Sequence, residues 1–250
     1  MRLKIFSNYS PNFNPIKRNK TQIKFLIFHY TGMKKESDAI KKLTNSKSDV
    51  SCHHFIKNNG ETFVMVPDLY IAWHAGESRW KNYKSLNRNS IGIEISNPGH
   101  ELNYKKFSNK QIQSIIKLSK ILIKKYKIRP KNILGHSDIA PERKKDPGEK
   151  FPWKELAKRG VGIWHSISDN KLKKNRKIEL DKISEKMFYN NLSKFGYVVK
   201  KNENSKNRKF NNYIVKAFQR RFRQELVNGK LDKECLIISK NLAKNFHKIS

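Results

Sequence analysis

The segment 135–148, which reads GHSDIAPERKKDPG, contains residues that could bind a metal ion. His136 is followed ten residues later by Asp146, and imidazole and carboxylate groups both serve as metal ligands in proteins. Pro141 and Pro147 restrict the backbone of this segment, which we expect to be a loop, and so favour fixed ligand positions. A His-to-Asp spacing of ten is common, however, so a metal site here needs another ligand from elsewhere in the chain.

His29 is the best candidate for that ligand, because it ends the apolar run 23–28, which is typical of a buried strand. Residues 91–95 alternate in character, with isoleucines on one face and Gly92 and Glu94 on the other. A glycine beside Glu94 indicates that another part of the protein approaches this face closely. We therefore expect His29, Glu94 and His136 at strand ends, where α/β proteins usually form their sites.

Two histidines and one carboxylate would leave a tetrahedral zinc ion with one open position, which is the catalytic pattern. Water bound there would ionise near neutral pH and attack a carbonyl or phosphoryl group. Glu94 is then a candidate general base that transfers the water proton to the leaving amine. Lys144 could stabilise the oxyanion of a tetrahedral intermediate, although composition alone favours a solvated charge in the run 143–145.

Other histidines and carboxylates compete for a role in the site. His53 and His54 are adjacent on a predicted strand, so they face opposite sides and at most one could enter a site. His74 could line a binding cleft. Asp138 and Glu142 are rival ligands to Asp146, but Asp138 should point away from His136, and Glu142 fits a helical turn. For any of these residues alone, a structural role is commoner than metal binding.

The chain divides into a larger α/β part and a smaller helical part. Alternating strands and helices indicate a central mixed β-sheet flanked by helices in residues 1–167, after an extended lead-in over 1–20. A polar linker is expected at 168–176. Residues 177–250 should form a small all-α domain of three helices, with a polar loop at 202–209 and Gly196 as a helix stop. The expected strands are 23–29, 50–56, 62–66, 91–95 and 133–135, and the expected helices are 37–43, 108–126, 151–157, 178–195, 213–222 and 231–246.

The composition limits the possible partners only weakly. The 250 residues include 55 Lys+Arg and 21 Asp+Glu, a formal net charge of +34 that will attract polyanions. Lysine, asparagine and isoleucine are all abundant, so the charge could reflect a compositional bias. Cys52 and Cys235 lie far apart and form neither a disulfide framework nor a metal cluster. The N-terminal residues lack the apolar core of a signal peptide, and no run approaches the length of a membrane span.

Taken together, the motifs of residues 23–157 resemble the type 2 N-acetylmuramoyl-L-alanine amidases, which are relatives of the peptidoglycan recognition proteins. The resemblance implies one Zn²⁺ held by His29, His136 and Asp146, with Glu94 and Lys144 as the catalytic pair. It implies hydrolysis of the amide between the lactyl group of N-acetylmuramic acid and L-alanine, in peptidoglycan or muropeptides, for cell-wall turnover or recycling. The matching segments are 28–31, 50–53, 72–76, 89–94, 135–141, Lys144 and 146–148, and the expected substrate-binding residues within or beside them are Tyr30, His53, Trp73, His74, Ala75 and Gly76.

Departures from the family pattern are small in this part of the chain. Cys52 stands where a small residue is usual, and Glu142 where glycine is common. Residues 177–250 resemble a type 1 peptidoglycan-binding domain through segments 192–197, 217–219 and 229–232. There the departures are larger, with Asn228 in place of aspartate and Cys235 near a customary threonine.

Two alternatives to a zinc amidase are a non-catalytic peptidoglycan-binding protein and a basic nucleic-acid-binding protein. Retention of all five site residues argues against the first, and no recognised nucleic-acid-binding motif supports the second. We therefore expect peptidoglycan or muropeptides as partners and no specific nucleic acid. The wall-binding-like domain favours the cell envelope or periplasm, and the missing signal peptide makes the cytoplasm the second choice.

Overall fold

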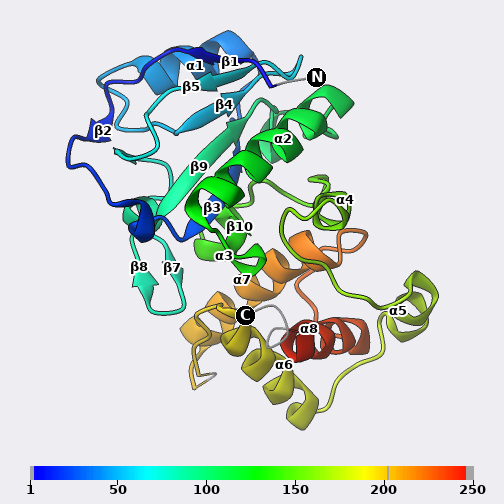
Figure 1. Ribbon diagram of the computed structural model, residues 1–250. Helices are drawn as coiled ribbons and strands as arrows, with labels where there is room; N and C mark the ends of the chain where they lie inside the picture. The colour runs from blue at the N-terminus through cyan, green and yellow to red at the C-terminus, as the bar shows by residue number, and fades with distance from the viewer. Residues whose placement is uncertain (1–2, 202, 246–250) are drawn as a thin grey trace.

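The computed structural model describes residues 3–201 and 203–245, and its centre is a six-stranded sheet (Figure 1). The strand order is β1-β5-β4-β9-β3-β10. Strand β4 runs antiparallel to β5 and every other pair is parallel, so the sheet is mixed, as predicted. The strands are β1 (Ile5–Ser7), β3 (Phe25–Tyr30), β4 (His54–Ile56), β5 (Thr62–Val64), β9 (Ser90–Ile95) and β10 (Ile133–Gly135).

Strand β3 lies between β9 and β10 and runs parallel to both, which explains its continuous apolar sequence. His29 is aligned directly with Glu94 of β9. Gly135, the last residue of β10, is aligned with Phe28. The three strands therefore end at the same edge of the sheet, as predicted.

Helices cover both faces of the sheet. Helix α2 (Asn109–Tyr126) begins at a capping box formed by Ser108 and Gln111, and its apolar side packs on the face that carries the β9 isoleucines. Helix α1 (Glu36–Thr44) packs near the other end of the sheet, where Ala39 and Leu43 share a cluster with Phe55 of β4. Helix α4 (Trp153–Lys158) adds Trp153 to the cluster beneath α2.

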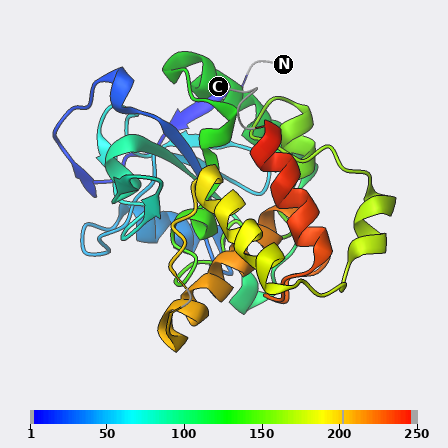
Figure 2. The ribbon, with the colours of Figure 1, turned by 90° about the horizontal axis from the view of Figure 1, so that it is seen from below.

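The C-terminal helices pack onto the sheet through one continuous hydrophobic cluster. It joins Phe25, Ile27 and Leu134 of the sheet to side chains of α6, α7 and α8. These helices group together below the sheet in Figure 1 and around each other in Figure 2, with α5 set to the outside. The helices of this unit are α5 (Asp169–Asn175), α6 (Lys182–Phe195), α7 (Ser205–Phe222) and α8 (Lys233–Asn245).

Short elements that the sequence did not predict complete the fold. The lead-in contains β1 and β2 (Phe13–Asn14), and β2 pairs with β6 (Ile71–Ala72). A hairpin of β7 (Arg79–Trp80) and β8 (Tyr83–Lys84) projects toward the C-terminal helices. Single-turn 3₁₀ helices are η1 (Lys20–Gln22), η2 (Leu86–Asn89), η3 (His100–Leu102) and η4 (Pro130–Asn132).

Several predicted boundaries were wrong. The prediction of a polar loop at 202–209 is wrong for its second half, because α7 begins at Ser205 with Asn204 as its cap. The first turns of α7 are polar because they face solvent. The predicted linker contains α5, and the strand expected at 50–56 begins only at His54. The segment 135–148 is not entirely loop, since α3 (His136–Ile139) forms one helical turn after β10. The end of the last predicted helix, at 246, lies outside the described residues. The division into domains stays a prediction.

No helix in the described part of the chain combines the length and the apolar character needed to cross a membrane.

Candidate metal centre and active site

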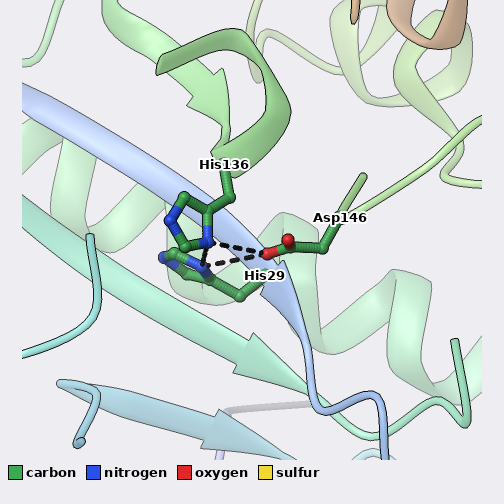
Figure 3. Close-up of side chains that lie close together, drawn as sticks. All are labelled: His29, His136 and Asp146. Atoms are coloured by element: carbon green, nitrogen blue, oxygen red, sulfur yellow. Dashed lines mark hydrogen bonds and ion pairs between the residues drawn. The ribbon is translucent and has the colours of Figure 1, made fainter. Parts of the chain in front are cut away.

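The structure brings His29, His136 and Asp146 together at the edge of the sheet (Figure 3). The Nδ1 atoms of the two histidines lie 2.9 Å apart. Oδ2 of Asp146 lies 3.1 Å from each of those nitrogens. All three side chains are buried, with 2%, 4% and 6% of their residue surface exposed. The three ligand atoms thus form a nearly equilateral triangle, although His29 is more than a hundred residues away from the other two.

This triangle fits a tetrahedral zinc ion. Bonds of 2.0–2.1 Å from a tetrahedral zinc to nitrogen and oxygen ligands place neighbouring ligand atoms about 3.3 Å apart. The observed separations of 2.9–3.1 Å are close to that value. Two imidazoles and one carboxylate are also the number and kind of protein ligands found in catalytic zinc sites. The donor set and its geometry therefore suit a metal ion with one position left open.

Hydrogen bonds on the outer side of each histidine orient its ring. Nε2 of His136 lies 3.1 Å from the carbonyl oxygen of Ala75, which can only accept. Nε2 of His29 lies 2.9 Å from Nδ1 of His74, and Nε2 of His74 lies 3.1 Å from the Ser90 hydroxyl, which donates to the Leu86 carbonyl. If each group donates along this chain, both ligand nitrogens keep a free lone pair for a metal ion.

Gly92 makes room for this arrangement. A Cβ atom on Gly92 would lie 2.4 Å from Cγ of His74, which is closer than any side chain permits. The close approach that the sequence indicated on the Glu94 face of β9 is therefore made by the His74 ring. The glycine lets this imidazole lie against the strand and reach His29.

Burial and neighbouring charges set the protonation of the site. Burial, and then the nearby His136, lower the pKa of His29 to about 4, so its imidazole is neutral at physiological pH. Burial opposes ionisation of Asp146, but the charge and hydrogen bonds of His136 and His29 outweigh it and lower the pKa of that carboxyl. Burial, followed by repulsion from Asp146, raises the pKa of Glu94 to about 8.

A cavity of about 350 Å³ opens over the three residues. Glu94 and Lys144 line it, and both are partly exposed. Tyr30, Trp73 and His74 also line it, whereas His53, Ala75 and Gly76 do not. Ala75 instead contacts His136 through its carbonyl group, so the expected substrate-binding set is divided between the cavity wall and the support behind it.

The remaining candidate residues lie away from the cavity. Nδ1 of His53 accepts from the Gly92 backbone N–H, and Nε2 of His54 lies 2.8 Å from Oδ1 of Asp68. Asp138 turns toward α7, where it pairs with Arg221. Glu142 is exposed and lines a separate cavity.

The cavity also has cationic lining residues that the sequence analysis did not single out. Lys42, Arg143 and Lys145 reach it from α1 and from the loop before Asp146. Arg143 donates to the Ala75 carbonyl at 3.1 Å, and Lys145 pairs with Glu101 at 2.6 Å. The basic run 143–145 was the available signal, but a run of cations alone does not indicate which members face a cavity.

Comparison with known proteins agrees with the fold and the site. Residues 19–149 match the family model described as N-acetylmuramoyl-L-alanine amidase. The N-acetylmuramoyl-L-alanine amidase AmiD of Escherichia coli (strain K12) is 33% identical over 237 residues, which cover 90% of this chain and 84% of AmiD. The chain therefore belongs to the N-acetylmuramoyl-L-alanine amidase family, of type 2, and is an amide hydrolase.

Solved structures extend the similarity over both parts of the chain. AmiD from E. coli, in complex with the substrate anhydro-N-acetylmuramic acid-L-Ala-D-γ-Glu-L-Lys, superposes with a TM-score of 0.78 at 32% identity, covering 93% of this chain and 92% of AmiD. AmpDH3 from Pseudomonas aeruginosa, in complex with anhydromuramic pentapeptide, gives a TM-score of 0.77 at 28% identity and 95% coverage of each chain. The 1,6-anhydro-N-acetylmuramyl-L-alanine amidase AmpD of E. coli (strain K12) is 38% identical over only 104 residues, 42% of this chain and 55% of AmpD.

Proposed function

We propose that this enzyme uses one Zn²⁺, held by His29, His136 and Asp146, to hydrolyse the amide between the lactyl group of N-acetylmuramic acid and L-alanine. The single observation that carries the proposal is the triangle of three buried ligand atoms at the base of a cavity that Glu94 and Lys144 also line. The choice of this amide bond is supported by the family to which the chain belongs, the N-acetylmuramoyl-L-alanine amidases. The anhydromuramyl peptides bound to AmiD and AmpDH3 favour muropeptides as the substrate class.

Glu94 and Lys144 have different proposed roles in the hydrolysis of the amide bond. A zinc ion at this position supplies Lewis acidity and a water molecule that ionises near neutral pH. Glu94 accepts the proton of the attacking water at its carboxylate and returns it to the departing amine of L-alanine. Burial and then Asp146 raise the pKa of Glu94 to about 8, which suits the protonated group that must deliver a proton to the amine. The positive charge of Lys144 lowers this pKa and so favours the carboxylate that must first accept the proton. Lys144 places a positive charge beside the oxyanion of the tetrahedral intermediate.

The cavity wall suits a peptide that carries carboxylates. Lys42 and Arg143 lie around the same opening as the ligands. The stem peptide in the AmiD complex includes a D-γ-Glu residue, whose free carboxylate would pair with such cations. The Tyr30 and Trp73 rings offer apolar surface to the sugar or the lactyl group.

Metal analysis combined with muropeptide digestion tests the proposal. We expect one zinc ion per chain and release of free stem peptide from anhydromuramyl-L-Ala-D-γ-Glu-L-Lys, detected by mass spectrometry. Chelation should abolish the release, and added Zn²⁺ should restore it. A protein that holds no zinc and frees no peptide would leave the non-catalytic binding function in its place.

A further inference from the structure

The helical turn that carries His136 is hydrogen-bonded to side chains of the C-terminal helical unit. Asp138 lies on α3, two residues after His136, and is 2% exposed. Its Oδ2 accepts from the Gly135 N–H at 2.8 Å and from Nη1 of Arg221 on α7 at 2.7 Å. Its Oδ1 accepts from the hydroxyl of Tyr197. One buried carboxylate therefore joins the start of α3 to two side chains of the C-terminal unit.

Arg221 contacts the chain on both sides of His136. Besides binding Asp138 after it, Arg221 donates through Nη2 to the Ile133 carbonyl before it, at 2.8 Å. The guanidinium lies 4.6 Å from the centre of the Trp153 ring, and Arg221 is 1% exposed. A planar, rigid group that bridges β10 and α3 limits how far the turn between them can rotate.

Two further contacts hold neighbouring parts of the site. The amide of Gln224, just after α7, donates to the carbonyls of Glu149 and Phe151 at 2.7 and 2.6 Å, close behind Asp146 in the chain. The Ser137 N–H donates to the Asp146 carbonyl at 2.8 Å, so α3 and the third ligand are tied together. Hydrogen bonds thus connect the backbone around His136 to the C-terminal unit, and the backbone around Asp146 is connected to it through residues 149 and 151 and through Ser137.

We propose that Arg221 and Tyr197 are positioning residues which, through Asp138, hold His136 in its metal-binding orientation, so that the C-terminal helices form part of the frame of the metal site. This inference rests on the proposed zinc site. It gives the C-terminal unit a role distinct from binding peptidoglycan. Asp138, a rival ligand by sequence, then supports a ligand from behind without contacting the ion.

The chain offers a matched control on the same helix. Arg223, two residues beyond Arg221, is 3% exposed and forms a buried ion pair with Asp232. Asp232 accepts from the Cys235 N–H at the start of α8, much as Asp138 accepts from Gly135 at the start of α3. The Arg223–Asp232 pair lies within the C-terminal unit and has no contact with α3 among the described interactions.

The test compares two double variants of the full-length protein. Arg221→Met with Asp138→Asn removes the pair that holds α3, and Arg223→Met with Asp232→Asn removes the control pair. The readouts are the Kd for Zn²⁺, from competition with a chromophoric chelator, and the visible spectrum of the Co²⁺-substituted protein. Because outer partners of metal ligands typically change metal affinity by about 10- to 100-fold, we expect the first variant to weaken zinc binding at least about tenfold and to alter the Co²⁺ bands. The control should stay within about twofold of wild type.

Equal effects of the two variants, or unchanged zinc binding by a folded Arg221→Met/Asp138→Asn protein, would overturn the inference. If that variant does not fold, Tyr197→Phe decides, since it removes only one hydroxyl. A rise in Kd of about threefold or more supports the inference, and an unchanged Kd rejects it. Failure of the wild type itself to bind zinc would instead reject the proposed function on which the inference depends.

Discussion

The two ends of the parallel strands β3 and β10 differ in how their charged and polar side chains are arranged. At their carboxyl ends, His29, His136 and Asp146 are buried and face one another within 3.1 Å. At their amino ends, a cavity of about 580 Å³ has a strongly basic lining, with no carboxylate among the described residues that line it. The cations around this second cavity are Lys20, Lys24, Lys81, Lys125, Lys127, Arg129 and Lys131.

The two ends differ in how their charged groups relate to one another. At the carboxyl end, each of the two histidines is oriented by a partner behind it: His74 orients His29, and the Ala75 carbonyl orients His136. At the amino end like charges gather, and burial followed by the charges of Lys131 and Arg129 lowers the pKa of Lys81. Lys125 differs, because it pairs with Asp68 at 2.8 Å. Groups that orient one another can bind a specific ligand, whereas a cluster of like charges only produces a positive electrostatic potential. The first arrangement depends on the fold, and the second can arise from the basic composition alone.

The largest effect should follow from removing a ligand at the carboxyl end. His29→Ala or Asp146→Ala should lose bound metal and activity together, with turnover reduced about a thousandfold or more, because each deletes one of three protein ligands. Elemental analysis and muropeptide digestion measure the two losses. A variant that kept zinc and activity would remove that residue from the ligand set.

A smaller effect is expected from Glu94→Gln. The amide keeps the shape of the side chain but cannot accept the water proton, so turnover should fall about a hundredfold or more. Zinc content should remain at the wild-type level because Glu94 is not a proposed ligand. Full activity in this variant would refute the role of Glu94 in proton transfer.

His74→Phe should have an intermediate effect on metal binding. The ring keeps its place against Gly92 but loses the hydrogen bond to Nε2 of His29, so the Kd for zinc should rise about 10- to 100-fold. Turnover at saturating zinc should change less. His165→Phe replaces a buried histidine outside the cavity lining and should bind zinc as the wild type does. Equal zinc affinities in the two variants would show that the bond to His29 contributes nothing.

The smallest effect should come from the amino end of the sheet. Lys24→Glu places a carboxylate among the cations of the basic cavity, which relieves repulsion at an exposed position. We expect a rise in Tm of less than about 2 °C and a change in kcat of less than about twofold. A loss of activity as large as that of Glu94→Gln would mean that the two ends of the sheet are coupled.

Sequence reasoning found the strands and their ends because the signals were local. The apolar run before His29, the alternation around Glu94 and the helix capped by Ser108 each depend on a few neighbouring residues. The two- and three-residue strands of the lead-in and the β7–β8 hairpin were missed because such short segments carry no periodicity.

Roles that depend on distant partners could not be predicted in the same way. His74 was expected to line a cleft, and it does line the cavity, but its hydrogen bond to His29 depends on how the loop after β6 folds against Gly92. Asp138 looked like a rival ligand until α7 brought Arg221 to it from 83 residues away. Sequence gives the kinds of groups present, but a long-range hydrogen bond depends on the packing of the finished fold.

The alignment of His29 with Glu94 has a further consequence for how this enzyme can vary. The proposed ligand and the proposed base sit opposite each other in the backbone ladder of adjacent strands, so their spacing is fixed by main-chain geometry. A shift of β9 by a single residue would bring Ile93 or Ile95 opposite His29 and turn the carboxylate to the far side of the sheet. Insertions in the surrounding loops can reshape what the enzyme accepts, but one inside β9 would remove the reaction altogether.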